Sequence, residues 1–427
     1  TLLPSVRGKA LHYIDAAGRR AAKEHANETA LGWFDRALQL EVRRPWLKGR
    51  AEALHILGRR AEEEATLHAL DASSAAEADR LEGAMLWAQF YTATGDYAAA
   101  GAALQRAQAL AVTLGDRHSQ ARCRCEGALI DWRQGDYAAA QVGYAAALEL
   151  SGGGPLAGEA DGPPDAGPDD GPDAGLDVQG EAHYGLGLVY RQQGHYEAAR
   201  AELGLALAVN RQLGDRRHEA RTLNALGSVA GLERDYAAAA DHFSAALQLR
   251  ELIGDRAGVG TSLMSLAQVY GSLGDYSRVE PLLHQALEIQ QAVRNRWEEM
   301  LVLNELGILY TAVGQYAAAV DFLTRALAHS RTIGSEIGAA YVLCNLGQAQ
   351  RDAGALAAAA QSMAEGLRLA QEQGDVNLEA IYLGDAAALS LRTGEPAAGA
   401  AQAERALALF AELDLPLSCT AVYGTLA

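Results

Sequence analysis

A short turn-like tripeptide recurs at a fixed interval along this chain and limits the folds that are open to it. Gly-Asp-Tyr or a close relative begins at positions 95, 135, 194, 234, 274 and 314, and two decayed copies begin at 354 and 394. The starting positions advance by a constant step of forty, except between 135 and 194, where the step is nineteen longer. A fixed period of this length is typical of solenoids, in which each repeat is one supersecondary unit that packs against its neighbours.

A second Gly-Asp break divides each repeat into halves. It lies midway between successive turns of the first kind, as at Gly115-Asp116, Gly214-Asp215 and Gly374-Asp375. Glycine supplies the left-handed position after a helix, and aspartate caps the start of the next helix. The segments between breaks have about 18 residues, which is long for strands, and their apolar residues recur at intervals of three and four. Each repeat is therefore predicted to be a hairpin of two helices, and the fold class to be all-α.

Small residues recur at one position in each half of the repeat. In the first half they are Ala88, Ala128, Gly187, Gly227, Ala267, Gly307, Gly347 and Ala387. In the second half they are Ala107, Ala147, Ala206, Ala246, Ala286, Ala326, Gly366 and Ala406. A small side chain lets a neighbouring helix approach closely, so these positions are predicted to face bulky residues across helix crossings.

These positions resemble the tetratricopeptide repeat in its 40-residue, long-helix variety. The pattern of that family places Leu-Gly, Tyr, Ala, Phe and Ala at the offsets of Leu226-Gly227, Tyr236, Ala239, Phe243 and Ala246. The resemblance covers about residues 75–427 and implies an α/α superhelix, a solenoid of stacked hairpins whose first helices line a concave groove. The last two copies lose the turn tyrosine, which fits a capping unit at the end of an array.

The repeat positions predict four segments. Residues 1–74 are expected to form divergent helical hairpins, 75–151 two repeats, 152–178 a loop insertion, and 179–427 six repeats with the last one degenerate. The insertion consists largely of Gly, Pro and Asp, a composition that excludes a helix and indicates a disordered spacer. Its aspartates lack the alternate spacing of an EF-hand loop, which disfavours a calcium site.

The segment that leads into the repeats, from Ala21 onward, is similar to a stretch found in large bacterial signalling proteins. In signal-transduction ATPases with numerous domains and in transcription activators of the maltose-regulator type, such a stretch joins a nucleotide-binding switch to C-terminal tetratricopeptide repeats. The chain begins with Thr1 rather than Met. We therefore expect it to be the C-terminal repeat region of a longer multidomain signalling protein.

Composition and motifs narrow the classes of function. The formal net charge is −18, which disfavours direct nucleic-acid binding and attraction to an acidic membrane. No apolar run is long enough to span a bilayer, and the four cysteines form no C-x-x-C pair, so a cytoplasmic location is expected. No P-loop, H-E-x-x-H or G-x-S-x-G motif occurs, so neither a cofactor, a metal nor an enzymatic activity is predicted. His118 and His218 follow Gly-Asp at helix starts and are expected to be ordinary surface residues.

The ligand-facing positions of the family can be carried over to this chain by their offset from each turn. They are Arg122, Cys125, Trp132, Arg133, Tyr184, Leu188, Arg191, Arg221, Asn224, Ser228, Met264, Gln268, Asn304, Glu305, Tyr341, Asn345, Gln348 and Arg351. Arginine and asparagine can bind a peptide backbone or a carboxylate in a bidentate manner. Asn224 and Asn304 occupy the same offset two repeats apart, and asparagine is a poor choice for a solvated helix face, so these two are the strongest candidates.

The resemblance implies a protein-interaction and sensor module that binds a peptide, a protein or a small inducer in its groove and regulates a linked signalling domain. A self-standing adaptor scaffold is one alternative. A repeat region attached to a protease or cyclase domain outside this chain is another. The exposed ends of such an array also allow self-association.

Overall fold

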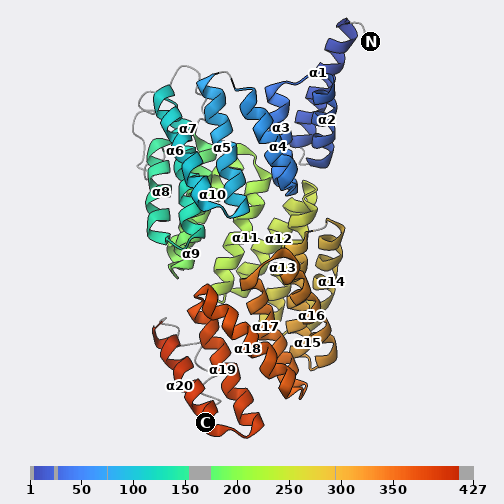
Figure 1. Ribbon diagram of the computed structural model, residues 1–427, viewed down its shortest axis with the longest axis vertical. Helices are drawn as coiled ribbons and strands as arrows, with labels where there is room; N and C mark the ends of the chain where they lie inside the picture. Colours follow the sequence, from blue (N-terminus) through green and yellow to red (C-terminus); the bar gives the residue numbers. More distant parts are fainter. Residues whose placement is uncertain (1–3, 24–26, 75, 153–174, 294, 413–427) are drawn as a thin grey trace. The chain divides into compact units, whose positions relative to one another are not determined.

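The computed structural model describes residues 4–23, 27–74, 76–152, 175–293 and 295–412 (Figure 1). Within these residues the regular structure is α-helical throughout, as the repeat pattern predicted. The chain divides into two compact units, residues 1–255 and residues 256–427, and each is described by itself.

The first unit contains α1 to α12, and the second contains α13 to α20. The helices of the first unit are α1 (Pro4–Lys23), α2 (Asn27–Leu40), α3 (Arg44–Leu57), α4 (Arg60–Ala72), α5 (Glu77–Thr94), α6 (Tyr97–Leu114), α7 (Arg117–Arg133), α8 (Tyr137–Leu150), α9 (Leu176–Gln192), α10 (Tyr196–Leu213), α11 (Arg216–Leu232) and α12 (Tyr236–Leu252). Those of the second are α13 (Arg256–Ser272), α14 (Tyr276–Ala292), α15 (Arg296–Ala312), α16 (Tyr316–Ile333), α17 (Glu336–Asp352), α18 (Leu356–Gln373), α19 (Val376–Thr393) and α20 (Pro396–Glu412).

The Gly-Asp breaks act as the sequence predicted. Gly95 and Gly115 follow α5 and α6 in the left-handed conformation, with φ of 82° and 69°. The next residue then caps the following helix, because the Asp96 carboxylate accepts a hydrogen bond from the Ala99 amide at 3.0 Å and Asp116 accepts one from Ser119 at 2.9 Å. In each turn the glycine ends one helix and the aspartate starts the next. The spacing of the turns therefore sets the helix lengths and the period of the repeat.

Small residues sit at the helix crossings within each hairpin, which confirms the second prediction. A Cβ atom built on Gly227 of α11 would lie 2.8 Å from the Phe243 ring of α12, and one on Gly347 would lie 2.8 Å from Cγ of Met363. The alanines of the second helices, such as Ala246, are fully buried. The paired helices can therefore approach more closely than larger side chains would permit.

Leucines at two repeat positions pack into the hydrophobic core at the boundary between successive repeats. Leu148 of α8 packs against the buried cluster that contains Leu186 of the following repeat. Leu207 of α10 packs in the same way against the cluster that contains Leu226. The first leucine of each pair lies at one fixed offset after its turn glycine, and the second lies at one fixed offset before the next turn. The contact is therefore a property of the repeat.

Helix α9 begins at Leu176, directly after Gly175, whose φ of 83° is left-handed. It therefore includes the last three residues of the segment 152–178, whereas residues 153–174 lie outside the described residues. Before the repeats, α1 to α4 pack successively, and Phe34 and Trp46 lie in one of their buried clusters.

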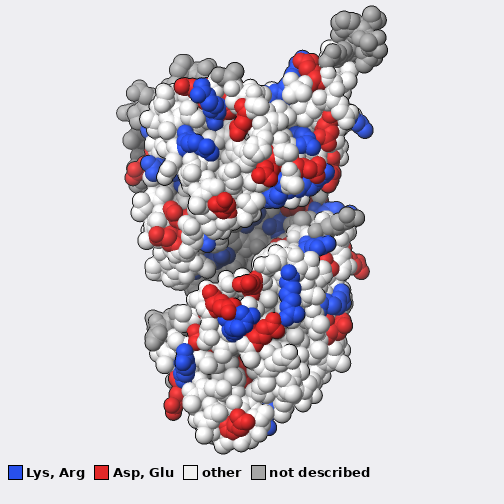
Figure 2. All heavy atoms as spheres, viewed as in Figure 1, with Lys and Arg blue, Asp and Glu red and all other residues white. Residues whose placement is uncertain are grey.

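No helix among the described residues is both long and apolar enough to cross a membrane. Figure 2 shows acidic and basic side chains interspersed over the visible face, without a continuous basic field.

Candidate functional site

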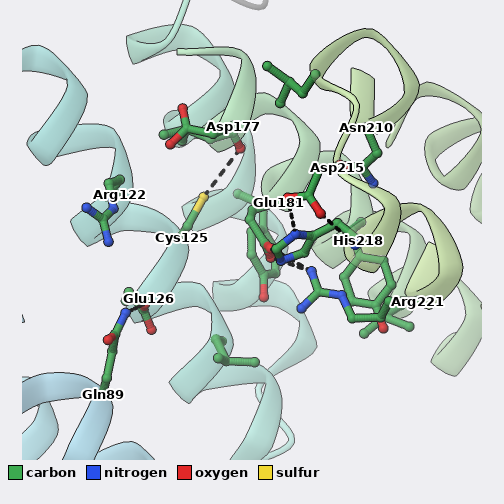
Figure 3. Close-up of a pocket in the computed structure, with 16 residues that line it drawn as sticks. Gln89, Arg122, Cys125, Glu126, Asp177, Glu181, Asn210, Asp215, His218 and Arg221 are labelled. Carbon is green, nitrogen blue, oxygen red and sulfur yellow. Dashed lines mark hydrogen bonds and ion pairs between the residues drawn. The ribbon is translucent and has the colours of Figure 1, made fainter. Parts of the chain in front are cut away.

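A polar pocket of about 580 Å³ lies in the first unit, on the helices that open successive repeats (Figure 3). Helices α5, α7, α9 and α11 supply most of its lining, and α8 and α10 supply the rest. The lining residues are Gln89, Arg122, Cys125, Glu126, Leu129, Tyr144, Asp177, Val178, Glu181, Tyr184, Leu188, Asn210, Leu213, Asp215, His218 and Arg221.

One wall of the pocket is a closed network of four charged groups. The Glu181 carboxylate of α9 accepts hydrogen bonds from Nη2 of Arg221 at 2.7 Å, and it lies 2.9 Å from Nε2 of His218. The other ring nitrogen of His218 lies 2.6 Å from Asp215, the residue that caps α11. The Arg221 guanidinium also lies over the Tyr184 ring, 4.0 Å from its centroid. Two cations and two carboxylates thus hold α9 against α11 with their charges matched.

The contacts of this wall shift the pKa values of its members. Hydrogen bonds that the His218 ring donates to Asp215 and then to Glu181 raise its pKa from 6.5 to about 9, so the ring is protonated at neutral pH. Burial alone would raise the pKa of Glu181, but His218 and Arg221 outweigh burial and hold it at about 2. The hydrogen bond from His218 likewise lowers the pKa of Asp215 to about 2.

The network predicts a specific dependence of stability on pH. Because the His218 pKa is raised on folding, its contribution is complete below pH 6.5 and is lost as the pH rises to about 9. The carboxylates act in the opposite sense, and their contribution is lost as the pH falls from about 4 to about 2. More than a third of each side chain remains exposed, so screening limits the alkaline loss to less than about 1 kcal/mol.

Urea unfolding at about pH 6 and about pH 9 checks this expectation. The native chain should lose stability between the two values, and a His218→Gln variant should lose less. An equal loss in both proteins would assign the pH dependence to other groups.

The opposite wall carries two charged groups of α7 that attract each other across one helical turn but form no salt bridge among the described residues. Arg122 of α7 has no hydrogen-bond or ion-pair partner within the described part of the chain. One turn later, Glu126 accepts a hydrogen bond from the neutral Gln89 amide at 2.8 Å, and burial raises the pKa of its carboxyl group. Figure 3 shows both side chains on the side of the pocket away from His218.

Arg122 belongs to a row of alternating charges. Glu82, Arg122, Glu181 and Arg221 occupy one and the same position, at a constant offset before the first turn, in four successive repeats. Glu82 lies 2.7 Å from Nζ of Lys48, and Glu181 pairs with Arg221. Both neighbouring carboxylates have other cationic partners, and neither forms a salt bridge with Arg122.

The structure brings together five of the residues predicted from the family positions in this unit. Arg122, Cys125, Tyr184, Leu188 and Arg221 line the pocket. The others have different surroundings. Arg133 donates to the Thr92 carbonyl at 3.0 Å, Arg191 donates to Ser228 at 3.4 Å, Trp132 packs against a hydrophobic cluster, and the half-buried Asn224 lies outside the lining.

In the second unit the predicted residues contact each other across successive first helices. Gln268 donates to Glu305 at 3.0 Å, and Asn345 donates to Asn304 at 2.9 Å. Asp385 accepts from Gln348 at 2.7 Å and from Arg351 at 3.0 Å, whereas Tyr341 donates to Asp375 at 3.0 Å and Met264 is buried. The polar character of these residues is therefore partly explained by contacts between repeats.

Three of these contacts follow one rule that the sequence analysis missed. Gln89, Gln268 and Gln348 each lie six residues before a turn, and each bonds to a carboxylate 37 residues later. The acceptors, Glu126, Glu305 and Asp385, each lie nine residues before the next turn. Comparing these two positions between neighbouring repeats would have revealed the Gln–carboxylate pairs without a structure.

The sequence analysis also missed Glu181 and Asp215, and it assigned His218 to an ordinary surface position. The structure instead places the His218 ring in the pocket between two carboxylates. His118 is 44% exposed and lies 3.6 Å from Asp177. Across the described residues, no group of three or more His, Cys, Asp or Glu side chains could hold a metal ion.

Comparison with known families supports the repeat assignment. The tetratricopeptide repeat family matches residues 179–251 and 219–292, and a second family of the same description matches residues 302–336. No curated protein sequence matches the chain.

Several solved structures are similar in fold. A Rap protein complexed with Competence and Sporulation Factor has a TM-score of 0.59 and 12% identity, over 87% of this chain and 98% of that one. Aspartyl phosphate phosphatase F from Bacillus subtilis has a TM-score of 0.55 and 12% identity, over 87% and 95%. A Signal Transduction ATPase with Numerous Domains with a tetratricopeptide repeat sensor, from Pyrococcus horikoshii, has a TM-score of 0.55 and 15% identity, over 84% and 54%. At these identities the likeness concerns the fold.

Proposed function

Because this chain is an array of tetratricopeptide repeats, we propose that it is a binding and sensor module whose ligand is a peptide segment held in the pocket of α5, α7, α9 and α11. The observation that carries the proposal is the pairing pattern in the lining. Four charges on one wall are joined by hydrogen bonds and ion pairs, whereas Arg122 and Glu126 on the other wall attract each other only across one helical turn and form no salt bridge among the described residues. A pocket whose lining includes charged groups that form no salt bridge favours a polar ligand that pairs with them.

A peptide satisfies the chemistry of this pocket. A carboxylate of the ligand would accept two hydrogen bonds from the Arg122 guanidinium, and an ammonium or amide group would donate to Glu126. Leu129, Val178 and Leu188 add apolar surface to the same lining. The fold neighbour solved as a complex with Competence and Sporulation Factor supports a binding role for such an array.

Substitution of the two unpaired charges tests the proposal. Purified chain is used to capture partners from lysate, the captured protein is mapped to a peptide by mass spectrometry, and the synthetic peptide is titrated by calorimetry. We expect Arg122→Ala with Glu126→Gln to weaken binding at least tenfold while leaving thermal unfolding nearly unchanged, because Arg122 is exposed and forms no salt bridge among the described residues, and glutamine at position 126 keeps an oxygen that can accept from Gln89.

Glu288→Ala with Arg325→Ala is the matched control, since it removes the same charges from exposed positions of the second unit. Equal weakening by both pairs would mean that only net charge matters. Unchanged affinity in the Arg122 and Glu126 variant would contradict the pocket as the binding site.

The regulatory part of the proposal is that binding biases a linked signalling domain, as in a sensor attached to a switch ATPase. Its support is the fold likeness to a switch ATPase that has a tetratricopeptide repeat sensor. The coding sequence next to this chain distinguishes the alternatives. A Walker A motif favours the switch, a Cys/His protease pair or a cyclase domain favours an attached enzyme, and repeats alone favour an adaptor scaffold.

A further inference from the structure

A second hollow, of about 660 Å³, lies on helices α6, α7 and α8 of the first unit, where most other repeats carry a leucine contact. Its floor and rim are formed by Leu104, Cys123, Ala128, Ile130 and Val112. Val112 is 59% exposed, whereas the other four are buried. None of the residues of the ion-paired pocket wall borders this hollow.

The hollow results from two coordinated departures from the repeat pattern. The repeat position of Leu148 and Leu207 is leucine in seven repeats and Gln108 in the remaining one. The repeat position of their partners, shortly before the next turn, is Trp or Leu in six repeats, Ala386 in the last, and Gly127 in the repeat that follows Gln108. At the two following boundaries the leucines at these positions belong to one buried cluster or pack against it. Both leucines are thus missing at one boundary.

The surroundings of both residues show that nothing in the described part of the chain replaces the lost leucines. A Cβ atom built on Gly127 meets no atom within 4 Å, and the Oε1 atom of Gln108 is buried without a hydrogen-bond partner among the described residues. A buried, unpaired amide oxygen is destabilising unless a donor reaches it. The space beside Gly127 is therefore open to an apolar side chain.

Two unpaired charges indicate what the occupant carries on either side. Arg124 and Asp131 border the hollow on α7, seven residues and therefore two turns apart, which is about 10 Å along the helix. Neither side chain has an ion-pair partner among the described residues. A segment with an acidic and a basic group at the same two-turn spacing would complement both charges.

We propose that this surface binds an amphipathic helix of a partner protein, with its leucines in the space left by Gln108 and Gly127. The acidic side chain of that helix pairs with Arg124, and its basic side chain pairs with Asp131. The open hollow bordered by the second helices α6 and α8 fits a helix laid into a groove. This surface is separate from the peptide pocket, so either can be correct without the other.

A designed probe tests the proposal on the full chain. The probe is a fluorescein-labelled, hydrocarbon-stapled helical peptide with two leucines one turn apart, midway between a glutamate and an arginine that are seven residues apart. We expect saturable binding by fluorescence anisotropy with Kd below about 100 µM. Gln108→Leu with Gly127→Leu restores the leucine pair and should weaken binding at least tenfold while raising Tm. Ala386→Leu, which adds a leucine at the same position of the last repeat, should leave binding unchanged.

The charge pairing has its own readout. Replacing both charges of the probe by glutamine, or changing Arg124→Gln with Asp131→Asn in the protein, should each weaken binding about fivefold, and the two changes together should add little.

Four results would overturn the proposal. The first three are no saturable binding up to about 1 mM, equal binding to the leucine-restored variant, and full additivity of the charge changes. In the fourth, the helical probe does not bind, but anilinonaphthalene sulfonate binds to the native chain and not to the leucine-restored variant. That result would assign the hollow to a small apolar ligand instead.

Discussion

Replacing Gly366 by alanine is expected to lower the free energy of unfolding by about 3 kcal/mol, although alanine occupies this position in every other repeat. Helix propensity alone predicts the opposite sign, because alanine is favoured over glycine by about 0.8–1 kcal/mol inside a helix. Steric overlap outweighs this gain. A Cβ atom on Gly366 of α18 would overlap both the hydroxyl group and the ring of Tyr382 in α19.

Tyr382 has no room to withdraw. Its side chain is 1% exposed, and its hydroxyl group donates to the Ala340 carbonyl of α17. The two preceding repeats carry Val302 and Val342 at the position of Tyr382, opposite alanines. The bulky tyrosine and the missing methyl group of Gly366 thus form one compensating pair.

Chemical denaturation of Gly366→Ala and of Gly366→Ala with Tyr382→Val checks this explanation. The double variant should recover part of the lost stability, because valine leaves room for the new methyl group. Gly204→Ala is the control, since a Cβ atom there meets nothing within 4 Å and should raise stability by about 0.5–1 kcal/mol. A Gly366→Ala protein as stable as the native chain would show that the crossing can open without strain.

A second large effect is expected from Leu148→Gln with Leu186→Gly, which reproduces the Gln108 and Gly127 combination at the next boundary. Leu186 is 5% exposed, and Leu148 packs against its cluster. Losing a buried leucine contact removes about 2–5 kcal/mol, and glycine inside a helix removes about 1 kcal/mol more. We expect a total loss of about 4–6 kcal/mol.

Hydrogen exchange locates the damage. Protection should fall mainly in α7 to α10, because these helices meet at the altered boundary. Restoring the leucine pair at positions 108 and 127 should change stability in the opposite direction. If the variant that loses two leucines and the variant that gains two leucines shifted stability in the same direction, leucine packing would not be the interaction that stabilises the boundary.

The periodic part of the fold was predictable because it depends on local chemistry. A glycine in the left-handed conformation followed by a capping aspartate acts within four residues, so the spacing of these two residue types predicted the helix ends. Burial of Ala246 and its equivalents was predictable for a related reason, since every hairpin repeats the same crossing.

The polar site was less predictable because its contacts join residues of different repeats. Asn304, a strong candidate for ligand binding, bonds to Asn345 of the next repeat, and a single-position analysis does not consider that partner. His218 lies in the pocket wall because Glu181 contacts it from the preceding repeat, and its own repeat contains no sign of that partner. The longer interval between the turns at 135 and 194 further hides this relation, because Glu181 lies directly after the interruption.

The Gln–carboxylate pairs constrain how such an array can change its number of repeats. Removing residues 315–354 would preserve every remaining helix and its phase, yet Asp385 would then face Ile308 instead of Gln348, and Arg351 would be lost with the deleted segment. The carboxylate would lose both donors at once. An exchange of whole repeats therefore keeps these hydrogen bonds only where the glutamine of one repeat still meets a carboxylate in the next. The unit that must be inherited intact is this pair of facing positions at the boundary, and not the single repeat.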